Sequence, residues 1–305
     1  MLSMALAALS FSLMFLGVKL YSDAPTFTLV FYRSVVQALL SGSLMWWGRR
    51  GNHQQATTTN DHIRLLLIAR GTLGSLAVAA MFAAIQGLPL PDAVTLQFTV
   101  PVFAALVAVP LLGEPWRRMD QVGAVVCLTG VMLMARPSWL FGGVTAVAAS
   151  TSSTTVATIV GLVGAFLAAL AYILVRQIGD RAGANLMVWY YAVISALTAP
   201  LGARLLSDTW DVMGQPTPSE LAVFAGLGVF GFLGQFWTNR GLNQCESAAM
   251  ATLITNTQIV FAFLFEVTIL HESISPWSLA GTALIVGYMG FVGIQKMRNE
   301  KNDKA

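Results

Sequence analysis

Long apolar runs alternate along this chain with short polar turns, several of them rich in proline or glycine. Each run is about 18–24 residues long, which is the length that a helix needs to cross a hydrocarbon layer about 30 Å thick. The runs lack the two-residue alternation that is typical of the strands of a transmembrane barrel. The pattern therefore predicts ten transmembrane helices, at 2–20, 27–48, 64–86, 91–111, 120–136, 156–176, 186–206, 220–239, 248–270 and 277–295.

The composition argues against a soluble protein. Of the 305 residues, 56% are hydrophobic and only 10% are charged, whereas a soluble domain carries about 25% charged residues. Because hydrocarbon offers no hydrogen-bond partner to the backbone, only helices and closed barrels span a membrane. We therefore expect an all-α membrane protein that has a lipid bilayer as its solvent.

The positions of the basic residues predict the orientation. If both termini are cytoplasmic, twelve of the 17 Lys and Arg residues fall in cytoplasmic segments and three in outer segments. This is the bias of the positive-inside rule, so the net charge of +3 reflects topology and does not indicate nucleic-acid binding. The first run starts at Leu2 with no basic leader, which favours a first span over a signal peptide. Both the plasma membrane and an internal membrane stay open as the location.

An internal repeat divides the chain. VFAALVAVPLLGE (102–114) and VFAFLFEVTILHE (260–272) match at seven of thirteen positions, and the offset of 158 also aligns Gly123 with Gly281. An odd number of helices in each half inverts the second copy relative to the first, as in many transporters. A segment rich in Gly, Ser and Thr lies between the halves and is typical of a linker. We expect a first repeat at 1–140, the linker at 141–155, a second repeat at 156–297 and a cytoplasmic tail at 298–305.

Several motifs resemble a known group of membrane proteins. The segment from RGTLG to LLGE (70–114), the RPSWLFG motif (136–142) and ATLITNTQIVFAFLFE (251–266) are similar to the EamA repeats of the drug/metabolite transporter superfamily, most of all to the G branch of solute carrier family 35. FLGVK (15–19) and FYRS (31–34) fit the first two helices of that repeat. The resemblance implies two inverted five-helix EamA repeats, with helices 1–4 and 6–9 around a central cavity. It leaves the substrate open among amino acids, nucleotide sugars, organic acids such as citrate, and drugs.

Two arginines lie inside predicted spans, where a charge is costly and is by default a functional candidate. Arg33 lies about seven residues into the second helix, and Arg70 lies at a similar depth in the third. A guanidinium binds a carboxylate or phosphate with two parallel hydrogen bonds, so either residue is a candidate for an anionic substrate. The alternative for both is that the long arginine side chain extends to the membrane–water interface. Close helix packing around GTLGS makes a structural role more attractive for Arg70.

Uncharged polar residues in three predicted helices form the next group of candidates. The polar side chains of helices 4 and 9 fall near the middle of the membrane, where a site between repeats is expected. In helices 7 and 8 we expect a polar group to line a pocket, whereas the aromatic cluster Trp189, Tyr190 and Tyr191 suits an aromatic belt at the interface. Hydrogen bonding between helices is an equally good explanation for any single polar residue. The candidates are Gln97, Thr99, Gln235, Asn239, Thr255, Asn256 and Gln258.

Nothing in the sequence suggests catalysis. The three histidines lie in predicted loops or at a helix end, Cys127 and Cys245 suggest no metal site, and no GxxxxGK[ST] phosphate loop occurs. We expect no cofactor and no metal, and a protein that is not an enzyme. A membrane-embedded enzyme and a scaffold without transport remain the alternatives, and a homodimer stays open.

We therefore expect a transporter of a small organic solute, with an organic anion favoured by the arginines, that works by alternating access. No chain of intramembrane carboxylates accompanies Glu266. This favours uniport or exchange over proton-driven transport.

Overall fold

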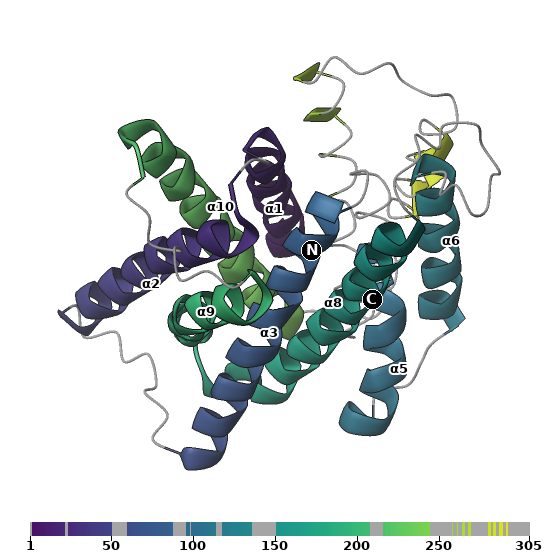
Figure 1. Ribbon diagram of the computed structural model, residues 1–305. Helices are drawn as coiled ribbons and strands as arrows, with labels where there is room; N and C mark the ends of the chain where they lie inside the picture. Colours follow the sequence, from purple (N-terminus) through teal and green to yellow (C-terminus); the bar gives the residue numbers. More distant parts are fainter. Residues whose placement is uncertain are drawn as a thin grey trace.

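The computed structural model describes residues 2–21, 24–50, 60–87, 96–97, 99–113, 118–135, 151–207 and 216–244, with scattered positions between 258 and 291. The elements of the described residues are helices (Figure 1). They are α1 (Leu2–Leu20), α2 (Thr26–Arg50), α3 (Asp61–Gly87), α5 (Val100–Leu112), α6 (Arg118–Ala135), α8 (Thr151–Ile178), the short 3₁₀ helix η1 (Gly179–Arg181), α9 (Ala184–Ser207) and α10 (Pro218–Gln244).

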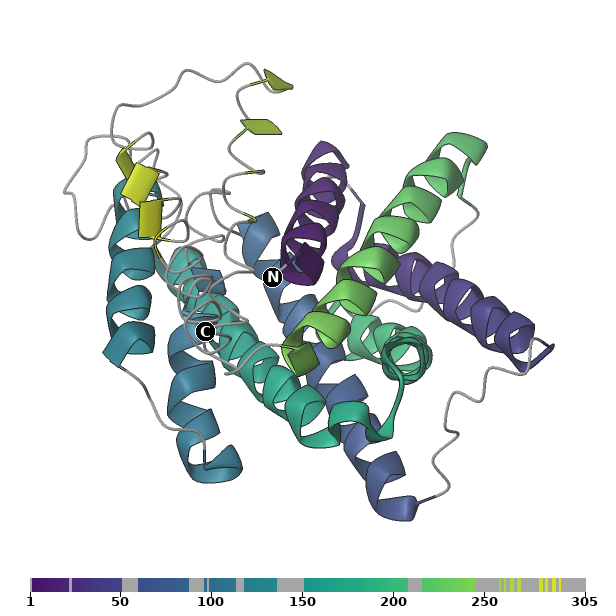
Figure 2. The same cartoon turned by 180° about the vertical axis from the view of Figure 1, so that it is seen from behind.

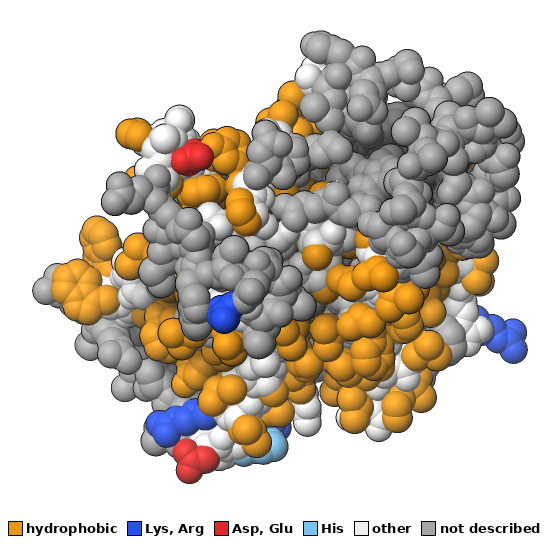
Figure 3. Space-filling view, viewed as in Figure 1, with side chains coloured by type: hydrophobic (Ala, Val, Ile, Leu, Met, Phe, Trp, Pro, Cys, Tyr) orange, Lys and Arg blue, Asp and Glu red, His pale blue; other side chains and the backbone are white. Residues whose placement is uncertain are grey.

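Five of these helices are long and apolar enough to cross a membrane. The spans are Thr26–Trp47, Asp61–Ile85, Val156–Arg181, Ala184–Arg204 and Pro218–Gln244. Their outward side chains are apolar, as lipid requires: Leu197 is 72% exposed and Leu65 is 64% exposed. Apolar side chains also cover most of the described surface on the face shown in Figure 3. The protein is an all-helical membrane protein.

One predicted boundary differs from the structure. Of the helix predicted at 91–111, residues 96–97 are helical and α5 starts at Val100 with a proline in its first turn, where proline is well tolerated; its predicted start lies outside the described residues. α8 starts at Thr151, five residues inside the predicted linker. The sequence TSSTT contains neither glycine nor proline, and extending an existing apolar helix costs little. The predicted helices 248–270 and 277–295 lie mostly outside the described residues.

The helices of the second half follow those of the first at the repeat offset. Adding 158 to the bounds of α2 gives 184–208, and α9 spans Ala184–Ser207; adding it to those of α3 gives 219–245, and α10 spans Pro218–Gln244. The packing partners correspond as well. α1 packs on α10, and their counterparts at the repeat offset, α8 and α3, pack on each other (Figures 1 and 2). α2 packs on its own counterpart, α9. The structure is therefore consistent with a repeat.

Small residues bring the paired helices close together. A Cβ added at Gly164 of α8 lies 2.9 Å from the Cβ of Ala80 and 3.3 Å from the carbonyl oxygen of Ala77, both on α3. Such close approach is how membrane helices gain packing energy when lipid is as apolar as the protein. It also places the side chains that lie further along these helices around one central space.

Polar side chains join α2 to α9 within the membrane span. Ser34 Oγ donates a hydrogen bond to Ser195 Oγ at 2.9 Å, and Asn185 Nδ2 donates to the carbonyl oxygen of Ser41 at 3.0 Å. All four residues are fully or almost fully buried. These bonds support the prediction that some intramembrane polar residues connect helices.

Candidate functional site

Two arginines are buried in the membrane-spanning helices. Arg33 of α2 is fully buried and Arg70 of α3 is 2% exposed. Among the described residues the only ion pair joins Arg64 to Asp61, at the exposed start of α3. Both buried guanidinium groups therefore carry their charge without a carboxylate from the described part of the chain, which is costly in a medium of low dielectric constant.

Two amides of α10 hold Arg70. Its Nη2 donates to Gln235 Oε1 at 2.6 Å and to Asn239 Oδ1 at 3.0 Å. These two acceptors are four residues apart on one helix, so they face the same side. The Nε and Nη1 atoms of Arg70 are buried and have no hydrogen-bond partner in the described structure. The amides thus orient the guanidinium and leave its charge without a counter-ion and its Nε and Nη1 groups without an acceptor among the described residues.

Tyr191 of α9 lies between the two arginines. The Cζ atoms of Arg70 and Arg33 are 5.0 and 5.6 Å from the centre of its ring, within the range of cation–π attraction. Arg33 Nη2 also donates to the Tyr191 hydroxyl at 2.7 Å. Since 33 and 191 differ by the repeat offset of 158, this contact joins equivalent positions of the two halves.

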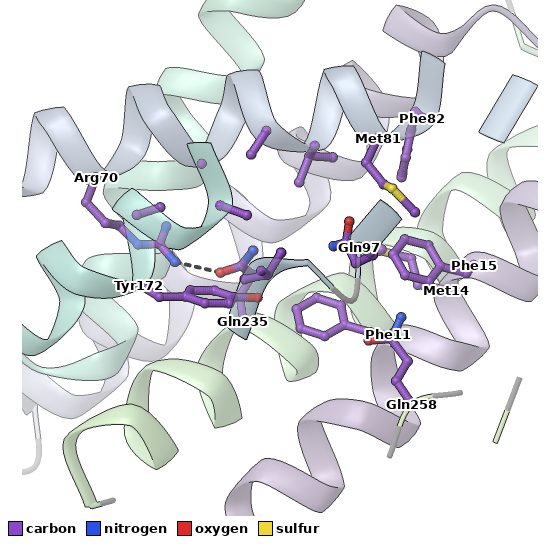
Figure 4. A pocket seen from close by; sticks show the side chains of 16 residues that line it. Phe11, Met14, Phe15, Arg70, Met81, Phe82, Gln97, Tyr172, Gln235 and Gln258 are labelled. Atoms are coloured by element: carbon purple, nitrogen blue, oxygen red, sulfur yellow. Dashed lines mark hydrogen bonds between the residues drawn. The ribbon is translucent and has the colours of Figure 1, made fainter. Parts of the chain in front are cut away.

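A cavity opens beside Arg70 between α1, α3, α8 and α10 (Figure 4). The volume that the centres of water-sized molecules can occupy in it is about 70 Å³. The residues that line it are Phe11, Met14, Phe15, Arg70, Gly74, Ala77, Val78, Met81, Phe82, Gln97, Val100, Ala168, Ala171, Tyr172, Gln235 and Gln258. Helices of both halves thus line the same cavity.

The cavity is polar at one end and mainly apolar at the other. Figure 4 shows Arg70, Tyr172 and Gln235 together at one end. At the other end, Phe11, Met14, Phe15, Met81 and Phe82 surround the space, and Gln97 and Gln258 add two neutral amides there. Such a cavity, mostly apolar with a few placed polar groups, is the usual form of a small-molecule site.

The structure brings together four of the predicted site residues, namely Arg70, Gln97, Gln235 and Gln258, as lining of the cavity. Asn239 supports Arg70 without being among the lining residues. Thr99 precedes α5, and its hydroxyl donates to the carbonyl oxygen of Leu96 at 2.6 Å. Thr255 and Asn256 lie outside the described residues.

Arg33 is placed differently from Arg70. It is not among the described residues that line the cavity. Its Cζ lies 5.9 Å from the centre of the ring of Phe82, which does line the cavity. Arg33 is therefore next to a residue of the cavity wall without lining the cavity itself, and its Nε and Nη1 atoms have no hydrogen-bond partner in the described structure.

Sequence analysis missed the aromatic part of the site. Phe11, Met14 and Phe15 follow helical spacing on α1, which is also the spacing of an ordinary packing stripe. Tyr191 was assigned to an aromatic belt, but it is fully buried and bonded to Arg33. The signal available for Tyr191 was its distance of 158 residues from Arg33, the offset of the repeat.

Comparison with known proteins agrees with this arrangement. The model of the EamA-like transporter family matches residues 1–136 and 155–293. A "Probable transport protein" of Saccharomyces cerevisiae is 30% identical over 73% of this chain, and human "Solute carrier family 35 member G1" is 30% identical over 73% as well. The matches span 65% and 60% of those relatives' own lengths.

A solved structure shows the same fold. A crystal structure of a protein that is 17% identical superposes with a TM-score of 0.75 and covers 98% of both chains. The family match covers most of the chain on both sides of the gap between the two repeats. This chain belongs to the EamA-like transporter family, a family of membrane transporters rather than enzymes.

Proposed function

We propose that this protein transports a small organic anion across a membrane by alternating access, as a uniporter or an exchanger. The observation that carries the proposal is Arg70, a buried guanidinium that lines a cavity within the membrane span and has unpartnered N–H groups. Buried cations are normally paired. An anionic group of a substrate supplies the missing partner and accepts hydrogen bonds from the N–H groups of Arg70.

The architecture of the proposal is ten helices in two inverted five-helix halves, at 1–140 and 156–297, with both termini cytoplasmic. The offset of 158 between helix bounds and the exchange of packing partners support it, because a two-fold axis relates α1·α10 to α8·α3 and maps α2 onto α9. A cavity between such halves opens to alternate sides when the halves change their relative tilt.

Within this site each polar residue has a proposed role. Arg70 binds the anionic group, and Asn239 positions Arg70. Gln97, Gln235 and Gln258 offer hydrogen bonds to the rest of the substrate. Arg33, whose Cζ is 5.9 Å from the centre of the Phe82 ring, acts through its charge rather than by direct contact.

A counterflow assay with purified protein in liposomes tests the proposal. The panel contains mono- and polycarboxylates, sulfonates, nucleotide sugars, amino acids and neutral metabolites, and it is repeated with Arg70→Gln. Arg64→Gln is the matched control, since Arg64 lies on the same helix but is exposed at its start. We expect saturable exchange of an anion that is lost in Arg70→Gln and retained in Arg64→Gln.

Two results contradict the proposal. Exchange of only neutral solutes, equally fast in Arg70→Gln, overturns the anion specificity. No exchange of any solute by monodisperse, folded protein overturns transport and favours a scaffold role.

A further inference from the structure

We infer that the cavity selects a small organic anion with a single negative charge and an apolar body about the size of one ring. This inference rests on the proposed function and narrows its substrate class. It follows from three properties of the cavity, namely its charges, its walls and its size.

The charges in the cavity match one anionic group. Arg70 is the one charged side chain among the described lining residues, and the other polar ones are Gln97, Tyr172, Gln235 and Gln258. Amides and a hydroxyl make neutral hydrogen bonds but do not neutralise a second anion. A second negative charge on the substrate is then buried without a cation in contact, which is strongly unfavourable.

Arg33 does not supply that second contact. It is not among the described lining residues, its Cζ lies 5.9 Å from the centre of the Phe82 ring, and one of its N–H groups is already bonded to Tyr191. Its charge attracts an anion from a distance but offers no hydrogen bond inside the cavity. Among the described residues, Arg70 is therefore the one cation that contacts an anion in the cavity.

The walls opposite Arg70 match an apolar ring. Phe11, Phe15 and Phe82 line that end together with Met14 and Met81 (Figure 4). Aromatic rings pack edge-to-face or offset on one another, and methionine sulfur makes favourable contacts with ring edges. A substrate whose charged end lies on Arg70 thus extends its body into an apolar surface.

The size limits the body. The space open to the centres of water-sized molecules is about 70 Å³, which matches a compact body such as one ring with one anionic group. A nucleotide sugar carries more than one negative charge and therefore does not match a single cation in contact.

A matched set of sulfonates tests the inference, because sulfonates stay ionised and do not leak through liposomes as neutral acids. Binding to detergent-purified full-length protein is measured by calorimetry. We expect benzenesulfonate to bind at least tenfold more tightly than each of three relatives. Benzenesulfonamide lacks the charge, methanesulfonate lacks the body, and benzene-1,3-disulfonate places a second charge at the apolar end.

Variants assign the preference to the cavity. Phe15→Ala is expected to reduce the ratio of benzenesulfonate to methanesulfonate affinity at least fivefold. Phe166→Ala is the control, because Phe166 is 41% exposed towards lipid and is not among the lining residues. An equal ratio in both variants overturns the assignment of the apolar end, provided that both proteins elute as single species.

The outcomes separate this inference from the proposed function. Disulfonate or citrate binding as tightly as benzenesulfonate overturns the inference, as does the absence of benzenesulfonate binding. Counterflow of citrate but not of benzenesulfonate keeps transport and also overturns the inference. Selective benzenesulfonate binding without counterflow supports the inference about the cavity and overturns transport.

Discussion

Arg33 and Arg70 share the ring of Tyr191 but face different surroundings. Arg70 lines the cavity and is held by two amides, whereas Arg33 is not among the described lining residues and bonds to the Tyr191 hydroxyl. Their Cζ atoms are 5.0 and 5.6 Å from the same ring centre, so they are at most 10.6 Å apart. The two cations therefore act on one bound anion through different forces, contact for Arg70 and long-range attraction for Arg33.

This difference predicts graded effects of substitution at Arg33. A unit charge about 10 Å away contributes roughly 1.7 kcal/mol at an effective dielectric constant of about 20, or about 15-fold in affinity. We expect Arg33→Gln to weaken anion binding by about that factor without abolishing it, and Arg33→Lys to stay near the wild type. Calorimetry with benzenesulfonate measures both. If Arg33→Lys binds benzenesulfonate as weakly as Arg33→Gln does, the positive charge at position 33 is not what strengthens binding of the anion.

Sequence patterns singled out several of the polar residues that line the cavity but none of the apolar ones. Arg70, Gln97, Gln235 and Gln258 were identified because polar groups are rare in an apolar helix, and the structure places all four on the cavity. The ring of Phe82 could not be told from core packing, since a lipid face, a core and an apolar pocket all use the same residue types. The contrast between Arg33 and Arg70 depends on how each helix is rotated, which apolar runs without a clear polar face do not reveal.

At the scale of helices, the lengths of the apolar runs predicted the helices well, whereas the residue types at their ends did not predict every boundary. α1 has the predicted bounds 2–20, and α2 and α9 differ from theirs by one or two residues. The start of α8 was misjudged because Ser and Thr were taken as loop formers, although a helix that is already formed accepts them. The length of an apolar run thus predicts that a helix is present, whereas the helix ends depend on whether the terminal residues favour a helix or a loop.

The contact between α3 and α8 gives a paired prediction about stability. Alanine favours a helix by about 1 kcal/mol over glycine, so Gly226→Ala, whose new Cβ meets nothing within 4 Å, is expected to keep or raise the melting temperature. Gly164→Ala is expected to lower it, because its Cβ lies 2.9 Å from that of Ala80 on α3. Thermal unfolding in detergent measures both variants. A melting temperature for Gly164→Ala at or above that of Gly226→Ala shows that α3 and α8 are not in this contact.

At the scale of the whole molecule, two halves share one central contact. The offset of 158 places Arg33 and Tyr191 at equivalent positions, and under the proposed two-fold relation two equivalent residues touch one another only beside the axis. The pairs α1·α10 and α8·α3 are likewise equivalent to one another. Each of these two pairs joins a helix of the first half to a helix of the second.

The proposed alternating access makes opposite demands on these contacts. A change in tilt moves the ends of the helices further than the centre, so a link beside the proposed axis is tolerated and a link at the ends is not. Ser34 follows Arg33, and Ser195 lies about one helical turn beyond Tyr191, so their hydroxyls, 2.9 Å apart, are near that axis. Met4 and Gly241 lie near the ends of α1 and α10, and the Met4 Cγ is 2.7 Å from the place of a Cβ at residue 241, which suits a disulfide.

Cysteine pairs at these two places test the mechanism. In a background with Cys127→Ala and Cys245→Ala, we expect oxidised Met4→Cys/Gly241→Cys to lose counterflow and to regain it on reduction. Oxidised Ser34→Cys/Ser195→Cys is expected to retain most of its activity, and loss of free thiols confirms each disulfide. Because α1 and α10 belong to different halves, full activity of the first pair when oxidised means that the two helices move together. The halves then do not tilt against each other, and the moving boundary lies elsewhere than between the repeats.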